Sequence, residues 1–239
     1  MPLRFNALFF ALAIVAIGTC AASCGSGNSA ARLRVVQTIA GAPSNLDISL
    51  GGKSAFTDVG FGVVLPQSGY NSLSPGNDTI AVFQTGTATP VIQSTPLNLR
   101  GKSEHTVVLT GPYAAPTALL VGDNNTSPPS GQVELRVIDA SPSAPPALDI
   151  YMVAPGTDIT EAVPSISSLS FEQASLYIPL TTHDGVTGSM VVITPAGDST
   201  QQLINHTYTL IDGQIRTLVL VDVPSGGSLS FTPLELADF

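Results

Sequence analysis

The stretch "LRVIDASPSAPPALDIYM", residues 135–152, repeats an earlier one, "LRVVQTIAGAPSNLDISL", residues 33–50. The two align without a gap at a constant offset of 102 residues, and eight of the first sixteen positions are identical. Farther along the chain the match continues with gaps, and Thr106 corresponds to Thr217. Such a self-match indicates that one unit was duplicated in tandem.

Each copy has the pattern of β structure. Short segments rich in β-branched residues are bounded by Gly, Pro, Asn or Asp, as strands are. These segments are LRVV, DISL, TIAVF, HTVVL, ELRVI, SMVVI and TLVLV. The nearest approach to a helical pattern after residue 24, "DITEAVPSISSL", is interrupted by Pro164. We therefore expect an all-β fold of two tandem Ig-like antiparallel β-sandwich domains, although the pattern alone also allows a barrel.

The domain boundaries follow from the repeat and from composition. The segment "NNTSPPSG" contains Pro128 and Pro129, which cannot donate to a β ladder, and it is the natural connection between the copies. The expected organisation is a signal peptide at 1–23, a flexible tether at 24–31, a first sandwich at 32–123, a linker at 124–131 and a second sandwich at 132–239.

The first residues resemble an export signal. Arg4 is the only charged side chain there, and Ala7 to Ile17 is an unbroken apolar run. Eleven helical residues would rise about 16 Å, against roughly 30 Å of bilayer hydrocarbon. The run is therefore too short to span a membrane comfortably, and it occupies the position of a signal-peptide hydrophobic region.

The segment "AASCGSG" resembles a bacterial lipobox, with small residues before Cys24. It departs from the usual pattern at Ala21, where Leu is most common. We expect Cys24 to carry lipid and to anchor the chain in the cell envelope. The outer membrane is favoured because Gly25 stands where some inner-membrane lipoproteins have aspartate. The alternative is ordinary cleavage near Ser29 and release as a secreted protein.

Charge excludes one class of partner. The formal net charge is −9, from 17 acidic and 8 basic residues. A polyanion gains nothing by docking on such a chain, so nucleic acid is not expected as a partner. The two cysteines are Cys20, which lies in the leader, and Cys24. No disulfide, thiolate nucleophile or cysteine-based metal site is therefore expected in the mature protein.

The repeated phrase "LRVxxAxPxAPxLDIY", a Phe–Tyr element and the closing "TLVLVD" resemble a bacterial family catalogued as domain of unknown function 4397. The resemblance covers nearly all of residues 32–239 and is clearer in the second copy. It implies a β-rich extracytoplasmic domain, often duplicated and frequently a lipoprotein. It implies no activity.

Both copies hold an arginine and an aspartate thirteen residues apart, Arg34 with Asp47 and Arg136 with Asp149. We expect their strands to be neighbours in one sheet, so that each pair forms a structural cross-strand ion pair. Aromatic residues also recur after the aspartate in each copy. For Phe61, Phe171, Tyr70 and Tyr177 we expect packing in the core or at strand corners rather than a sugar-binding platform.

No catalytic constellation is evident. His105, His183 and His206 lie in separate segments and lack the spacing of zinc ligands. The sequence also contains no GxSxG or SxxK motif of a serine nucleophile. The loops at 122–127 and 182–188 lack EF-hand spacing and are expected to be turns rather than calcium sites. We expect no cofactor, no metal and no enzymatic activity. The expected function is a binding or structural module with an unknown protein or glycan partner. The alternatives are a secreted adhesion or carbohydrate-binding protein and, with less weight, a hydrolase.

Overall fold

The structure is a computed structural model that describes residues 30–182, 186–225 and 228–238. The leader and Cys24 lie outside the described residues. Every regular element within the described ranges is a β-strand, so the all-β expectation is confirmed. No helix that could cross a bilayer occurs within those ranges.

The described residues form eighteen strands, which fall into two runs of nine. The first repeat consists of β1 (Ala31–Gln37), β2 (Leu46–Leu50), β3 (Lys53–Val59), β4 (Val64–Leu65), β5 (Asn71–Leu73), β6 (Gly76–Gln84), β7 (Pro90–Leu99), β8 (Glu104–Thr110) and β9 (Thr117–Asp123). The second repeat consists of β10 (Gln132–Asp139), β11 (Leu148–Val153), β12 (Ile166–Leu169), β13 (Gln173–Ala174), β14 (Ile178–Thr181), β15 (Val186–Pro195), β16 (Ile204–Ile211), β17 (Ile215–Ser225) and β18 (Ser228–Ala237).

The two repeats have the same sheet topology. In the first, one sheet has the order β4-β1-β8-β9 with β5 also pairing β1, and the other has the order β3-β2-β6-β7. In the second, the corresponding orders are β13-β10-β17-β18, with β14 pairing β10, and β12-β11-β15-β16. Strand n of the first repeat thus corresponds to strand n + 9 of the second.

Between the described strands, the pairing is antiparallel except for one pair of strands in each repeat. β1 pairs in parallel with β8, and β10 pairs in parallel with β17. The expectation of antiparallel sandwiches is therefore confirmed for most strand pairs, but these two pairs are parallel. The parallel register sets Arg34 beside Thr106 and Arg136 beside Thr217.

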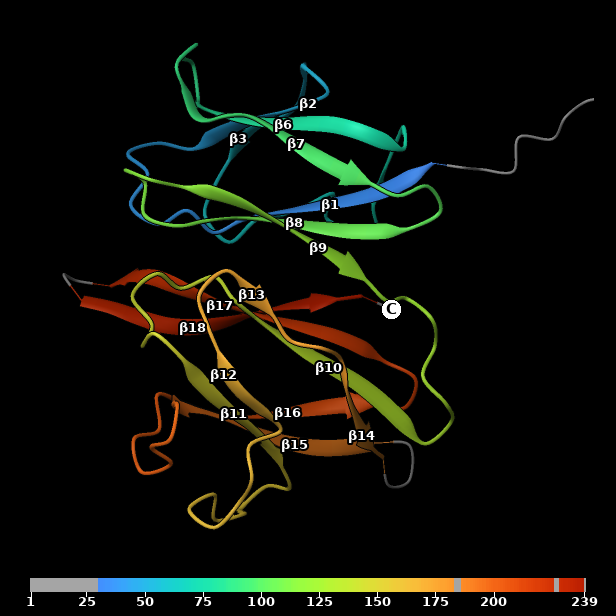
Figure 1. The fold of residues 1–239 in the computed structure, drawn as a ribbon, viewed down its shortest axis with the longest axis vertical. Helices are drawn as coiled ribbons and strands as arrows, with labels where there is room; N and C mark the ends of the chain where they lie inside the picture. Colours follow the sequence, from blue (N-terminus) through green and yellow to red (C-terminus); the bar gives the residue numbers. More distant parts are fainter. Residues whose placement is uncertain (1–29, 183–185, 226–227, 239) are drawn as a thin grey trace, which may run out of the picture.

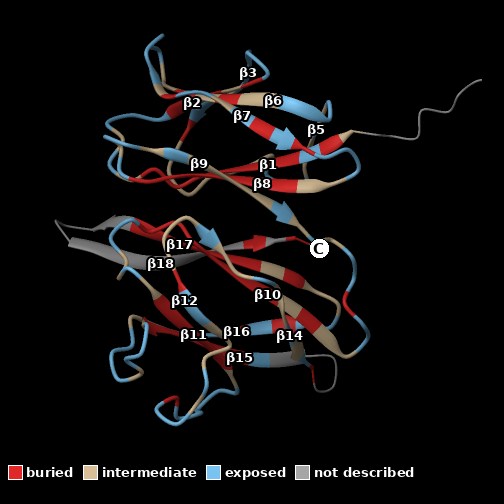
Figure 2. Cartoon of the chain, in the orientation of Figure 1, coloured by how far each residue is buried: buried red, intermediate tan, exposed pale blue. Residues whose placement is uncertain are grey.

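The four sheets are stacked as layers (Figure 1). The sheets that contain β1 and β10 face each other in the middle of the stack, and those that contain β2 and β11 lie at its two ends. Buried residues concentrate on the strands of the two middle sheets (Figure 2). Because those sheets are covered on both faces, their strands β1, β8 and β10 are buried along nearly continuous runs rather than at alternate residues.

Three apolar clusters fill the spaces between layers. One lies inside each repeat, around Leu33 and Ile48 in the first and around Leu135 and Ile150 in the second. The third joins the repeats, and it contains Val36, Val108, Ile138, Ala140, Val219, Val221 and Leu236. Residues of the parallel strands face alternately into their own repeat and into this shared layer, as the two-residue period of a strand requires.

Candidate functional site

The repeated arginines do not form the ion pairs expected from the sequence. β1 and β2 lie in different sheets, as do β10 and β11. Arg34 and Asp47 are therefore not cross-strand neighbours, nor are Arg136 and Asp149, and that expectation is wrong. The physical reason is the sandwich itself, because the chain crosses from one sheet to the other between the two strands of each phrase.

Each arginine instead pairs with the aspartate that ends the other repeat. Arg136 pairs with Asp123, which ends β9. The Nη2 atom of Arg34 lies 2.5 Å from Oδ1 of Asp238, directly after β18, and 3.6 Å from Oδ2 of Asp123. The arginines are 4 % and 1 % exposed. The two contacts are reciprocal between copies, as in an isologous interface.

Threonines and tyrosines of the same repeats complete this arrangement. Thr106 accepts a hydrogen bond from Nε of Arg34 at 3.1 Å and donates to Asp123 at 2.7 Å. Thr217 accepts from Nε of Arg136 at 2.7 Å and donates to Asp238. Each threonine therefore connects the arginine of its own repeat to the aspartate of that repeat.

The tyrosine rings lie over the guanidinium groups. The Arg34 guanidinium carbon is 5.1 Å from the centre of the Tyr70 ring, and that of Arg136 is 4.6 Å from the centre of the Tyr177 ring. The Tyr70 hydroxyl donates to Asp123 at 3.0 Å. Such stacking is a cation–π interaction, stronger where water is excluded. We call these residues the Arg–Asp network; its members are Arg34, Tyr70, Thr106, Asp123, Arg136, Tyr177, Thr217 and Asp238.

The electrostatics fit a buried cluster that is permanently charged. Burial opposes the charged form of Arg34, yet Asp238, Tyr70 and Asp123 together raise its pKa above the usual value. Burial, with the nearby Asp123, raises the pKa of Tyr70 well above its usual range. Burial likewise raises the pKa of Tyr177. Both tyrosines therefore keep their hydroxyl protons at physiological pH and remain hydrogen-bond donors to the carboxylates.

Hydrogen bonds to backbone carbonyls also connect the repeats. The Thr110 hydroxyl donates to the backbone carbonyl of Ala140 at 2.7 Å. Nη1 of Arg136 donates to the Gly122 carbonyl at 2.8 Å. With the shared apolar cluster, these bonds make a continuous and specific contact between the two middle sheets.

Asp47 and Asp149 have a different, equally repeated role. Asp47 accepts the backbone N–H of Asp58 at 2.9 Å, and Asp149 accepts that of Ser168 at 2.9 Å. Asp58 and Ser168 have φ angles of 58° and 54°, a left-handed conformation that non-glycine residues rarely adopt. Both lie beside an irregularity in the pairing of an edge strand, between Leu46 and Ile48 and between Leu148 and Ile150. The aspartates therefore fix two equivalent β-bulges.

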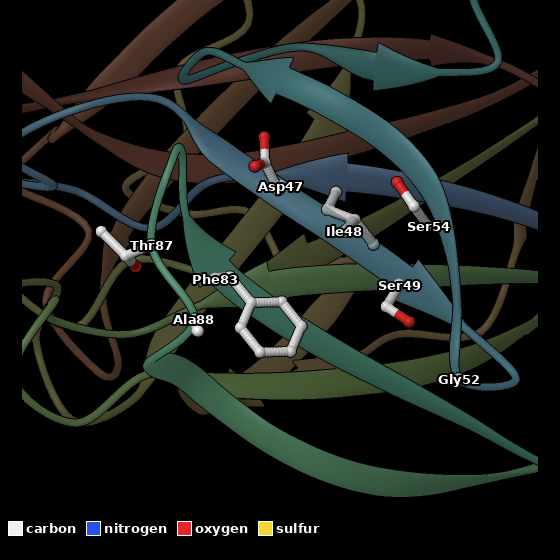
Figure 3. A pocket seen from close by; sticks show the side chains of 8 residues that line it. All are labelled: Asp47, Ile48, Ser49, Gly52, Ser54, Phe83, Thr87 and Ala88. Carbon is white, nitrogen blue, oxygen red and sulfur yellow. The ribbon is translucent and has the colours of Figure 1, made fainter.

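A pocket of about 350 Å³ lies over the sheet at the outer end of the first repeat. Figure 3 shows the Phe83 ring between the turn that contains Gly52 and the loop that carries Thr87 and Ala88. Ser49 and Ser54 contribute hydroxyls, and Asp47 lies at its edge. The pocket thus combines one aromatic ring with hydroxyl groups on a sheet face that points away from the second repeat.

The equivalent face of the second repeat is covered. The connection from β11 to β12 runs over residues 154–165, whereas β2 and β3 are joined by Gly51 and Gly52 alone. Its Ile159, 1 % exposed, packs on Tyr151, Met190 and Val192. The longer connection therefore buries in the second repeat a sheet face that the first repeat leaves open.

The remaining candidates lie apart from the Arg–Asp network. His105 is buried in β8, His206 on β16 contacts the Tyr208 ring at 4.5 Å between ring centres, and His183 lies outside the described residues. Phe61 packs against the shared apolar cluster, consistent with the expectation of packing. Within the described ranges, no three His, Cys, Asp or Glu side chains gather into a metal site.

Sequence reasoning missed Asp123 and Asp238, although a signal was present. The last strand of each repeat is followed or ended by an aspartate, in "LLVGD" at 119–123 and "LELAD" at 234–238. The lengths of the intervening connections differ between copies, so no constant offset exposes the match.

The sequence comparison identifies the family. A family model described as Domain of unknown function (DUF4397) matches residues 31–151. The chain belongs to this family. The matched DUF4397 region begins at β1, contains the whole first repeat, and ends within β11.

No curated protein matches the chain. Among solved structures, it is similar to the crystal structure of CBMbc (family CBM26) from Eubacterium rectale Amy13K in complex with maltoheptaose. The TM-score is 0.27 and the identity 9 %, over 84 % of this chain and 96 % of that chain. A similarity at this TM-score carries no argument about what the DUF4397 protein binds.

Proposed function

We propose that this protein is a lipid-anchored module of the cell envelope that provides a binding or structural surface and is not an enzyme. The observation that carries the proposal is the Arg–Asp network. The arginines and the strand-end aspartates that recur in both repeats hold the repeats together, which is a structural use of costly buried charge.

We further infer that residues 32–123 and 132–239 are two domains joined by a linker at 124–131. The reciprocal pairs make the two domains one body, since each arginine has its carboxylate partner in the other domain. A flexible tether at residues 24–31 would let the two joined sandwiches stand off the membrane surface.

The anchor is tested by fractionation. Wild-type protein is expected in the membrane fraction, and mass spectrometry of the mature N-terminus is expected to find Cys24 carrying acyl chains. Cys24→Ser is expected to move the protein to the soluble fraction. Soluble wild-type protein with a mature N-terminus near Ser29 would instead support the secreted alternative.

The open pocket of the first repeat favours a second candidate function, carbohydrate binding. Sugars are recognised by an aromatic ring that stacks on their apolar face and by hydroxyls that bond at their edges, and Phe83, Ser49 and Ser54 supply both kinds of group. The pocket lies on the outer sheet of the first repeat, on the face that points away from the second repeat.

A glycan array tests this second function. Phe83→Ala is expected to abolish binding of any glycan that the wild type retains. Leu176→Ala, which removes an exposed side chain in the other repeat, is the matched control and is expected to change nothing. Absence of glycan binding, or equal binding by wild type and Phe83→Ala, would exclude the pocket as a sugar site.

A further inference from the structure

The second repeat contains a buried acidic group that the Arg–Asp network does not use. Asp139 ends β10 and Asp222 lies near the end of β17, on adjacent parallel strands. Asp139 is 0 % exposed and Asp222 is 2 % exposed. Ser141 contacts both, because its N–H donates to Oδ1 of Asp139 at 3.0 Å and its hydroxyl donates to Oδ1 of Asp222.

No positive charge balances these two carboxylates. Among the described residues, neither aspartate forms an ion pair with Lys, Arg or His. The Oδ2 atom of Asp139 is buried and has no hydrogen-bond partner at all. An unpaired buried carboxylate is costly, so such a group either takes up a proton or binds a cation.

The first repeat provides an internal comparison. At the positions that correspond to Asp139, Ser141, Ser143 and Asp222 it has Gln37, Ile39, Gly41 and Gly111. Gln37 reproduces the local bond, since its Oε1 accepts the N–H of Ile39. Every other oxygen-bearing side chain of the group is replaced by Ile or Gly. The fold of the repeat therefore does not require these oxygens.

The geometry points to a cation-binding site: we propose that Asp139, Asp222, Ser141 and Ser143 bind a hard cation of the Ca²⁺ class. The side chains offer only oxygen, which such cations prefer. The Ser143 hydroxyl bonds to Oδ1 of Asp222 at 2.8 Å, so it lies in the same group. The unpartnered Oδ2 of Asp139 is the first ligand.

Thermal unfolding of the purified protein with CaCl2 tests the proposal. After dialysis against EDTA, about 10 mM Ca²⁺ is expected to raise the wild-type Tm by roughly 3–6 °C, which corresponds to a sub-millimolar to millimolar Kd. MgCl2 at the same concentration and NaCl at matched ionic strength serve as the ion controls and are expected to produce a smaller shift.

Asp139→Asn and Asp222→Asn remove one charge each without changing side-chain volume, and both are expected to lose the Ca²⁺-dependent rise. In EDTA, Asp139→Asn should be at least as stable as wild type, which shows that it folds. Asp198→Asn, in an exposed turn, is the control and should keep the rise. Isothermal titration with Ca²⁺ gives the second readout. No heat and no Tm rise in wild type, or the same rise in Asp139→Asn, would overturn the proposal.

Discussion

Arg136 and Asp123 belong to different repeats, and their buried side chains form an ion pair. The reciprocal pair, Arg34 with Asp238, repeats the relationship with the roles of the two copies exchanged. Duplication of a unit whose surface complements itself would produce this arrangement in one step, because each copy then carries both halves of the contact.

Removing one partner of a buried ion pair should strongly destabilise the folded protein. Asp123→Leu leaves the guanidinium of Arg136 buried without its carboxylate, and we expect a loss of about 3–5 kcal/mol in the free energy of unfolding. The double variant Arg136→Met, Asp123→Leu should lose less than the sum of the two single variants. Urea unfolding of the four proteins gives the coupling energy. Additive losses would contradict a direct pair.

The tyrosine contributes in two separable ways. Tyr70→Phe removes the hydroxyl that donates to Asp123 and should cost about 0.5–1.5 kcal/mol. Tyr70→Leu also removes the ring over Arg34 and should cost roughly another 0.5–2 kcal/mol beyond the loss of the hydroxyl. The comparison is made by denaturant unfolding at one pH. Equal losses for Phe and Leu would mean that the ring itself contributes nothing.

The bulge-fixing aspartate of the first repeat should respond to acid. The N–H of Asp58 and the Thr85 hydroxyl hold the pKa of Asp47 below its usual value. The stability that Asp47 contributes is therefore present above the unfolded-state pKa near 4 and is lost as the pH falls through the folded-state pKa. The free energy of unfolding of Asp47→Asn, measured by urea unfolding, should be lower than that of wild type at pH 7. The difference should shrink as the pH falls to about 2–3.

The control for that comparison is Glu161→Gln, which replaces an exposed carboxylate of the second repeat. Its acid response should be much closer to that of wild type. If the free energies of unfolding of Asp47→Asn and wild type differed by the same amount at every pH, the charge of Asp47 would not contribute to stability.

The packing of the connection at residues 154–165 against the sheet should depend mainly on the Ile159 side chain. Ile159→Ala should cost about 2–4 kcal/mol, since Ile159 is 1 % exposed and packs on Tyr151 and Met190. Val163→Ala, on the same connection but 84 % exposed, should cost less than about 0.5 kcal/mol. Thermal unfolding of the two variants gives the comparison, and similar losses would show that the connection does not pack as described.

Much of the fold could be predicted from the repeated phrase. The constant offset locates β1 with β10 and β2 with β11, and the β-branched segments predict strands wherever the core requires them. The ion-pair partner of Arg34, Asp238, could not be predicted, because the partner depends on which sheet each strand joins. That choice is made by contacts between residues far apart in sequence, such as the pairing of Arg34 with Thr106 in a parallel register.

The candidate cation site shows a second limit. The segment "DASPSAPP" is part of the repeated phrase, yet its aspartate and serines form a candidate site only because Asp222, some eighty residues later, lies beside them. A motif of two parts on parallel strands has no fixed spacing in the sequence. The Ile and Gly residues at the matching places of the first repeat were the available signal, once the copies were aligned strand by strand.

The central claim, that the Arg–Asp network joins two copies into one body, is tested most directly by differential scanning calorimetry of the purified mature protein at neutral pH. We predict a single transition whose calorimetric and van't Hoff enthalpies agree, and which separates into two transitions in Arg34→Met, Arg136→Met. Two resolved transitions in the wild type, each with about half of the total enthalpy, would contradict the claim.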